Sequence, residues 1–104
     1  MTYPSKYKDA QVEILGEPST ARQLTAGSAS SNTALTSTVR RISMRASGAD
    51  IRFSIGTGTQ TANGNTSNFI ANGERLDFAV PESANIAVIR DGTVNGTLEL
   101  TELI

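Results

Sequence analysis

The chain of 104 residues contains no cysteine, no histidine and no tryptophan. The absence of cysteine excludes disulfide bonds and thiolate chemistry, and the absence of histidine removes imidazole bases and the commonest zinc ligands. Most enzyme mechanisms are therefore excluded by composition, and we expect a protein that is not an enzyme and needs no cofactor.

Long apolar runs are also absent, and neither sign of charge dominates. No stretch approaches the roughly 20 apolar residues of a membrane span, and residues 1–10 lack the features of a signal peptide. The sequence has nine basic and ten acidic residues, so neither nucleic acid nor a membrane surface is expected as a partner. We expect a soluble chain made in a cytoplasm.

Large apolar side chains are scarce. Leu, Ile, Val and Phe together supply 23 of the 104 residues, just above the level at which a chain fails to collapse, and the net charge is only −1. A single domain of this size hides roughly two thirds of its unfolded surface. With so thin a core, association with partner subunits is expected to add stability.

The abundant residues favour strands and turns. Ser and Thr supply 24 residues and Gly nine, whereas Lys occurs twice, which is untypical of long helices. We predict an all-β fold, a small β-sandwich or jelly-roll-like barrel of about seven antiparallel strands, over residues 18–104. Residues 1–17 are predicted to form an extended N-terminal arm that ends at a turn or hinge signal, and residues 27–32 a loop.

Alternation of apolar and polar residues predicts which strand faces are buried. Ile51 and Phe53 alternate with polar neighbours, and a two-residue loop at positions 47–48 pairs Met44 with Ile51 and Ile42 with Phe53. The sequence therefore predicts a hairpin in which the apolar positions meet.

The same register has two further consequences. Arg45 is expected opposite Asp50 as an exposed ion pair. One extra residue, a β-bulge at positions 40–41, is expected to keep Val39 and Leu35 on the buried face.

Two more hairpins are predicted further along the chain. Asn72-Gly73 is a strong turn signal and aligns Phe69 with Leu76, while a turn over residues 91–95 joins the last two strands. Inward positions are expected for all three phenylalanines, Phe53, Phe69 and Phe78.

Candidate catalytic groups are few. Two carboxylate pairs, Glu74 with Asp77 and Glu99 with Asp91, are the only arrangement that suggests a small hydrolase, and no aromatic platform for a sugar accompanies them. The glycine- and threonine-rich stretch 56–65 lacks the Gly-Lys-Ser/Thr ending of a phosphate-binding loop. We interpret it as a flexible connection between strands.

Arg40, Arg41, Arg45 and Arg52 form the densest positive charge in the sequence. They are expected to meet phosphates or a partner's carboxylates, or else to be solvated or paired with neighbours such as Asp50.

The arm carries too few apolar residues to repay the entropy of ordering by itself. It is expected to order against a neighbouring subunit or, alternatively, to be the first strand of the domain's own sheet; residues 11–15 are predicted to form a short strand. The candidate partner-binding residues are Tyr3, Tyr7, Val12, Ile14, Arg40 and Arg41.

Residues 49–102 resemble a small all-β module of tailed-bacteriophage structural proteins. The motifs that carry the resemblance are Arg52-Phe53-Ser54-Ile55-Gly56, Phe69-Ile70-Ala71-Asn72-Gly73-Glu74, Phe78-Ala79-Val80-Pro81, Ile86-Ala87-Val88-Ile89-Arg90 and Gly96-Thr97-Leu98-Glu99-Leu100-Thr101-Glu102. The resemblance implies a head decoration (cement) protein on the outer capsid surface of the virion. Its implied partners are the major capsid protein and its own copies, since members of this class bridge capsomers and often form trimers.

A second interpretation is a receptor- or carbohydrate-binding module of a tail or head fibre. Such a module normally exposes aromatic side chains for stacking, and the inward positions expected for the phenylalanines count against it. A small hydrolase is the third.

Overall fold

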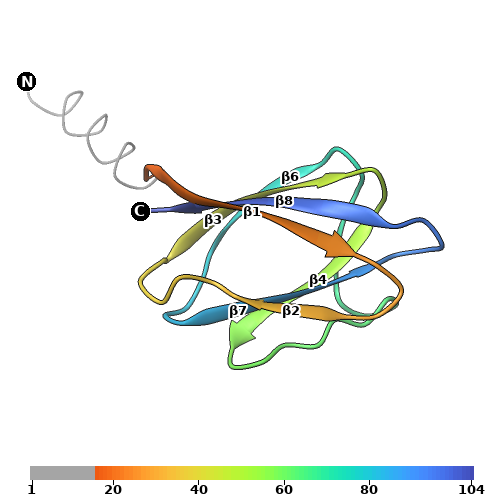
Figure 1. Cartoon of the computed structure of the whole chain (residues 1–104), viewed down its shortest axis with the longest axis horizontal. Helices are drawn as coiled ribbons and strands as arrows, with labels where there is room; N and C mark the ends of the chain where they lie inside the picture. The colour runs from red at the N-terminus through yellow and green to blue at the C-terminus, as the bar shows by residue number, and fades with distance from the viewer. Residues whose placement is uncertain (1–15) are drawn as a thin grey trace, which may run out of the picture.

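Eight antiparallel strands make up the part of the chain that the computed structural model describes, residues 16–104 (Figure 1). The strands are β1 (Pro18–Ala26), β2 (Ser31–Ala34), β3 (Arg41–Ser47), β4 (Ile51–Thr57), β5 (Asn68–Ile70), β6 (Arg75–Ala79), β7 (Ala84–Arg90) and β8 (Gly96–Leu103). This is one strand more than expected, because β2 begins inside the predicted loop 27–32.

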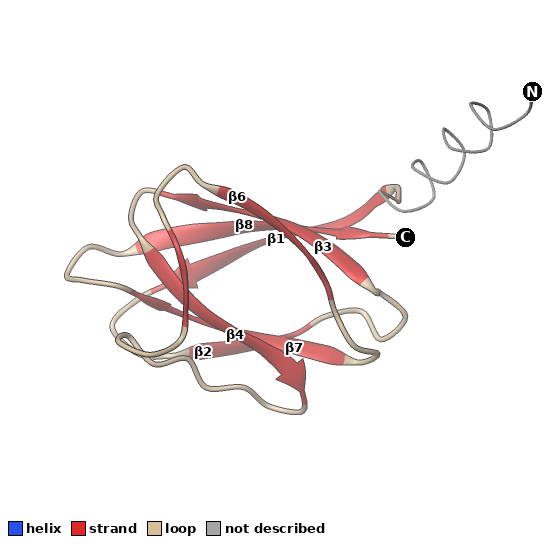
Figure 2. Ribbon diagram, turned by 180° about the vertical axis from the view of Figure 1, so that it is seen from behind, coloured by secondary structure: helices blue, strands red, loops and turns tan. Residues whose placement is uncertain are grey.

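The strands lie in two sheets that face each other, ordered β1-β8-β3-β6 and β2-β7-β4-β5 (Figure 2). Each strand of the first half pairs with one of the second half, β1 with β8, β2 with β7, β3 with β6 and β4 with β5. The chain is therefore one long hairpin that rolls up until β3 also pairs with β8 and β4 with β7. This connectivity is a jelly roll, so the predicted all-β sandwich is confirmed.

The three predicted short hairpins are wrong. The turns at residues 47–50, 71–74 and 91–95 each connect a strand of one sheet to a strand of the other. The inward positions were nevertheless assigned correctly for Met44 and Ile51, which are both buried. Two strands on opposite sides of one core both turn their apolar residues toward it, so alternation alone does not distinguish them from a hairpin.

The consequences drawn from the first hairpin are wrong for the same reason. Arg45 lies opposite Arg75 and Glu99 instead of Asp50. No bulge occurs at positions 40–41 because β3 begins at Arg41, and in the described residues the one register shift of the strand pairings lies between Pro18 and Ala21. Val39 and Leu35 are buried as expected, but they lie in the connection before β3.

The core lies between the sheets and is built from alternate residues of the strands. Its largest fully buried members include Phe53, Ile42, Met44, Ile51, Ile70, Ile86, Leu98 and Leu100. Phe69 is not an inward residue: it lies opposite Arg52 and is 42% exposed. Phe78 lies opposite the buried Ile42 but is 38% exposed, because β6 is an edge strand and the neighbouring β5 has only three residues.

The β1–β8 pairing extends to the first described residues. The N–H of Glu17 donates to the carbonyl of Ile104 at 2.7 Å, and the N–H of Ile104 donates back at 2.8 Å. Gly16 precedes them with a positive φ of 74°, which favours glycine. The predicted strand 11–15 and the candidate residues Tyr3, Tyr7, Val12 and Ile14 lie outside the described residues.

Candidate functional site

A carboxylate occupies an inward position at the end of β8. Gly96, Leu98, Leu100 and Glu102 are all buried, and Glu102 has no solvent exposure. Its carboxylate accepts hydrogen bonds from the N–H and hydroxyl of Thr36, at 2.9 and 2.7 Å, and pairs with Nε of Arg22 at 3.1 Å. In residues 16–104 every buried side-chain polar atom has such a partner. Glu102 was not among the residues expected to form a site, although the alternation of Leu98 and Leu100 places it on the inward face.

The surroundings of Glu102 keep it ionised. Burial by itself raises the pKa of this carboxyl, but the hydrogen bonds from Thr36 and the charge of Arg22 outweigh burial and hold the pKa below its ordinary value of 4.5. The carboxylate thus joins β1, β8 and the connection between β2 and β3. Because its oxygens are engaged and shielded from water, its role is structural.

Of the carboxylate pairs considered for catalysis, Glu99 and Asp91 are not brought together in one cleft. Glu99 lies on the exposed face of β8 and accepts a hydrogen bond from Gln23 at 3.0 Å, whereas Asp91 follows β7 and lines a different cavity. Glu74 accepts a hydrogen bond from the N–H of Ala71 within its own turn. Residues 16–104 contain no group of three or more acidic side chains that could hold a metal ion.

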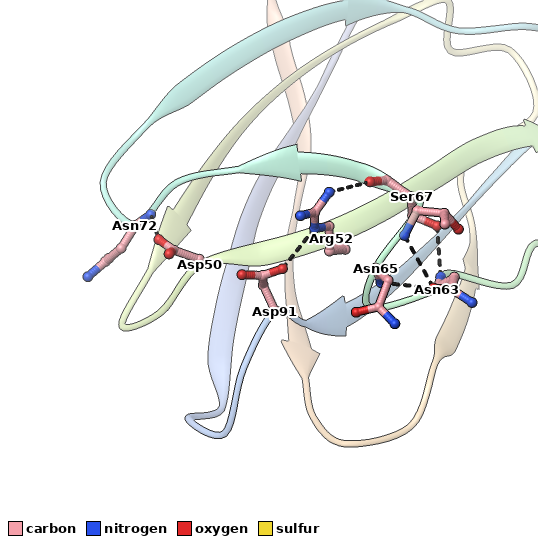
Figure 3. A network of polar contacts seen from close by, with 8 residues as sticks. Asp50, Arg52, Asn63, Asn65, Ser67, Asn72 and Asp91 are labelled. Atoms are coloured by element: carbon pink, nitrogen blue, oxygen red, sulfur yellow. Dashed lines mark hydrogen bonds and ion pairs between the residues drawn. The ribbon is translucent and has the colours of Figure 1, made fainter.

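Three loops line an open cavity of about 310 Å³ at one end of the sandwich. Asp50 accepts a hydrogen bond from the N–H of Asn72 at 2.8 Å, and Asp91 accepts one from Nε of Arg52 at 2.8 Å (Figure 3). Arg52 also donates to the carbonyl of Ser67 at 3.0 Å. Both carboxylates in this cavity therefore already hold loops together, which explains why the turns dock on each other.

The glycine- and threonine-rich connection between β4 and β5 is tied to the sandwich instead of being a free loop. The N–H of Gln60 donates to Asn32 at 2.9 Å, and the N–H of Ala62 donates to Ser30 at 2.8 Å. Within the loop, Oδ1 of Asn63 accepts hydrogen bonds from the N–H groups of Asn65 and Thr66 (Figure 3). These hydrogen bonds hold the loop against β2, which is an edge strand of its sheet, and Ala62 is buried there.

The arginines expected to form one cluster are divided between the two sheets. Arg52 lies on β4 and is paired with Asp91, whereas Arg41 and Arg45 lie on β3 in the other sheet. Arg40 precedes β3 and forms an exposed ion pair with Glu82 at 3.3 Å. The densest charge of the sequence is therefore not one binding patch.

A different pair of arginines meets on the β1-β8-β3-β6 sheet. Arg45 and Arg75 lie directly opposite each other on β3 and β6, and both are exposed. They line a shallow cavity of about 180 Å³ with Glu99 and Thr101, yet neither arginine forms an ion pair in the described part of the chain. Like charges directly opposite in a sheet are destabilising, and Glu99, directly opposite Arg45 on β8, offsets only part of this repulsion.

An apolar groove opens along the side of the sandwich, between β6 and the β4–β5 hairpin. It has a volume of about 370 Å³ and is lined by Phe53, Ile55, Asn68, Phe69, Leu76, Phe78, Ala79 and Pro81. The rings of Phe53 and Phe78 lie 5.7 Å apart at its base, and the guanidinium of Arg52 lies 4.8 Å from the centre of the Phe69 ring. The groove exists because β5 ends after three residues and leaves the side of the core uncovered.

Comparisons of the chain with protein-family models, with curated proteins and with solved structures found no match. Residues 16–104 contain no helix of the length and apolar character that crossing a membrane requires.

Proposed function

We propose that this protein is a non-enzymatic structural component of a tailed-bacteriophage virion, a decoration protein that binds the outer surface of the head and stabilises contacts between capsomers. The resemblance of residues 49–102 to such proteins suggests the class of partner. The jelly-roll fold is compatible with it, because this fold recurs in viral capsid proteins.

The observation that carries the proposal is the pair Arg45 and Arg75 on an exposed sheet face. These two guanidinium groups lie opposite each other and form no ion pair in the described residues, although Glu99 lies opposite Arg45 on β8, so they provide donors for acidic side chains of another protein. Arg41 lies on the same face of β3, four residues before Arg45. We therefore propose this face as the surface that contacts the major capsid protein.

Co-sedimentation with heads of the parent phage assembled without this protein tests the proposal. Wild type should pellet with the heads, and Arg45→Glu and Arg75→Glu should each weaken binding at least about tenfold, which corresponds to roughly 1.4 kcal/mol. Arg90→Glu is the matched control, because it makes the same change of charge on β7 of the other sheet. Failure of wild type to bind would contradict the function, and equal loss in the Arg90 variant would contradict the surface.

A receptor- or carbohydrate-binding module of a fibre is the second candidate. The exposed rings of Phe69 and Phe78 favour it, since sugars stack on exposed aromatic faces, and the sequence had predicted both rings to be inward. Binding of the purified chain to a glycan array, lost in Phe69→Ala and retained in Val94→Ala, would support this candidate over the first. Val94 is an exposed apolar residue outside the groove.

A further inference from the structure

The apolar groove leaves the core of the sandwich incomplete on one side. Phe53 is almost fully buried at its base, but Phe78 and Phe69 at its rims are 38% and 42% exposed. Strand β6 is the edge of its sheet, so its outer backbone groups face the groove's open side without a neighbouring strand. An extended segment with two alternating apolar residues would cover the rings and add a strand to a sheet edge.

The chain itself contains a segment of this kind. Residues 11–15 read Gln-Val-Glu-Ile-Leu, in which Val12 and Ile14 alternate with polar Gln11 and Glu13. This pattern predicts a short strand with one apolar face. The segment lies immediately before Gly16, the first described residue. The position of residues 16 and 17 in the fold therefore limits which parts of its own chain the segment can reach.

The groove of the same chain is out of range. Glu17 is held beside Ile104 at the β1 edge, while β6 is the opposite edge of that sheet, three strands away. A strand added beside β6 would lie four spacings from β1, about 19 Å. Ile14 precedes Glu17 by three residues, which extend at most about 11 Å. The segment cannot place Ile14 in its own groove.

We propose that residues 11–15 of a second copy of this chain fill the groove as an added strand, with Val12 and Ile14 against Phe78 and Ile55. Each copy then donates its segment to a neighbour and receives one. The exchange completes the apolar side of the sandwich and makes the protein a homo-oligomer. The inference does not depend on the proposed function, because it requires no capsid.

Sedimentation velocity of the full-length chain tests whether the oligomer forms. A concentration of about 10 μM is used because modest interfaces are expected to have micromolar affinities. Wild type should sediment as an oligomer, and Ile14→Asp and Phe78→Asp as monomers. Val94→Asp is the matched control because Val94 is exposed and apolar but lies outside the groove, and this variant should sediment as wild type. The Ile14 variant changes no described residue, so its result holds even if Phe78→Asp unfolds the domain. A monomeric wild type, or an oligomeric Ile14→Asp variant, would overturn the proposal.

Disulfide trapping tests whether the segment occupies the groove. The sequence contains no cysteine, so no other disulfide competes with the introduced pair. Differently tagged copies carrying Ile14→Cys and Ala79→Cys are mixed under mild oxidation; Ala79 is exposed at the end of β6 and lines the groove. The mixed dimer should form on the order of a hundredfold faster than with Thr93→Cys, because a bound segment raises the effective thiol concentration to the millimolar range. Thr93 is exposed in the loop before β8, at the other end of the sandwich. Equal rates for the two pairs would show that the segment does not occupy the groove of another copy.

Discussion

Replacing Glu102 by glutamine should destabilise the sandwich strongly, although the two side chains have nearly the same shape. The carboxylate accepts three hydrogen bonds, from the N–H and hydroxyl of Thr36 and from Nε of Arg22. A carboxamide oxygen can still accept from the Thr36 N–H and from Nε of Arg22, and the NH₂ group can donate to the Thr36 hydroxyl, which also accepts hydrogen bonds. The substitution therefore chiefly removes the negative charge that is the counter-charge of Arg22.

The magnitude follows from the burial of the two partners. Removing one partner of a buried ion pair costs about 3–5 kcal/mol. The side chain of Arg22 is 26% exposed and stays partly hydrated, which lowers the expected cost to about 2–4 kcal/mol. For a domain of this size that loss corresponds to a fall in Tm on the order of 10–20 °C.

The pH dependence gives the experiment a second readout. Because the folded-state pKa of Glu102 lies below 4.5, the unfolded chain takes up a proton at a higher pH than the folded chain does. The stabilisation is therefore fully present above about pH 4.5, the ordinary value, and is lost as the pH falls through the folded-state pKa. The difference in unfolding free energy between wild type and Glu102→Gln should be constant from pH 7 to about 5 and should shrink below 4.5.

Urea unfolding followed by circular dichroism across this pH range measures both effects. Glu99→Gln is the matched control, since Glu99 lies on the exposed face of the same strand, and it should change stability by less than about 0.5 kcal/mol. A Glu102→Gln variant as stable as the control at pH 7, or a difference that does not shrink in acid, would refute the assigned role.

Three further predictions concern the turns and the polar end. Gly73→Val should cost about 1–3 kcal/mol because its φ is +86°, whereas Gly92→Val, without positive φ or a close neighbour, should melt within a few degrees of wild type. Asp91→Asn should lower stability by about 1 kcal/mol, with a smaller effect at high salt, because its pair with Arg52 is partly exposed; a salt-independent loss would contradict this. Alanine at Glu74 and at Asp91, the catalytic candidates that lie outside the proposed contact face, should leave head binding intact, and a folded variant that loses function would refute a purely structural role.

Much of the local structure was predictable from the sequence. The period of two identified Ile51 and Phe53, and also Ile86 and Val88, as inward residues of strands, and all four are buried. Gly73 was identified as a turn residue, and its N–H and positive φ place it in a tight turn that docks on β3. These features depend on neighbouring residues and on the pleat of a strand, so they are written in short stretches of sequence.

Pairing of the strands, by contrast, was decided only by the tertiary structure. The register places Met44 opposite Leu76 and Leu100, which lie 32 and 56 positions further along the chain, and not opposite Ile51. Except for β4 and β5, strands that follow one another lie in different sheets here, and no local pattern records which distant strand lies alongside.

The candidate sites depend on the same long-range arrangement. Glu102 is stabilised because the roll brings Arg22 and Thr36, 80 and 66 positions away, to its carboxylate. Phe78 is exposed although its strand parity is inward, because the neighbouring edge is covered by only three residues of β5. Alternation in the sequence was enough to identify most residues that turn toward the core, with Phe69 as an exception, whereas the closure of the two sheets decided how completely each of them is covered and which charges meet.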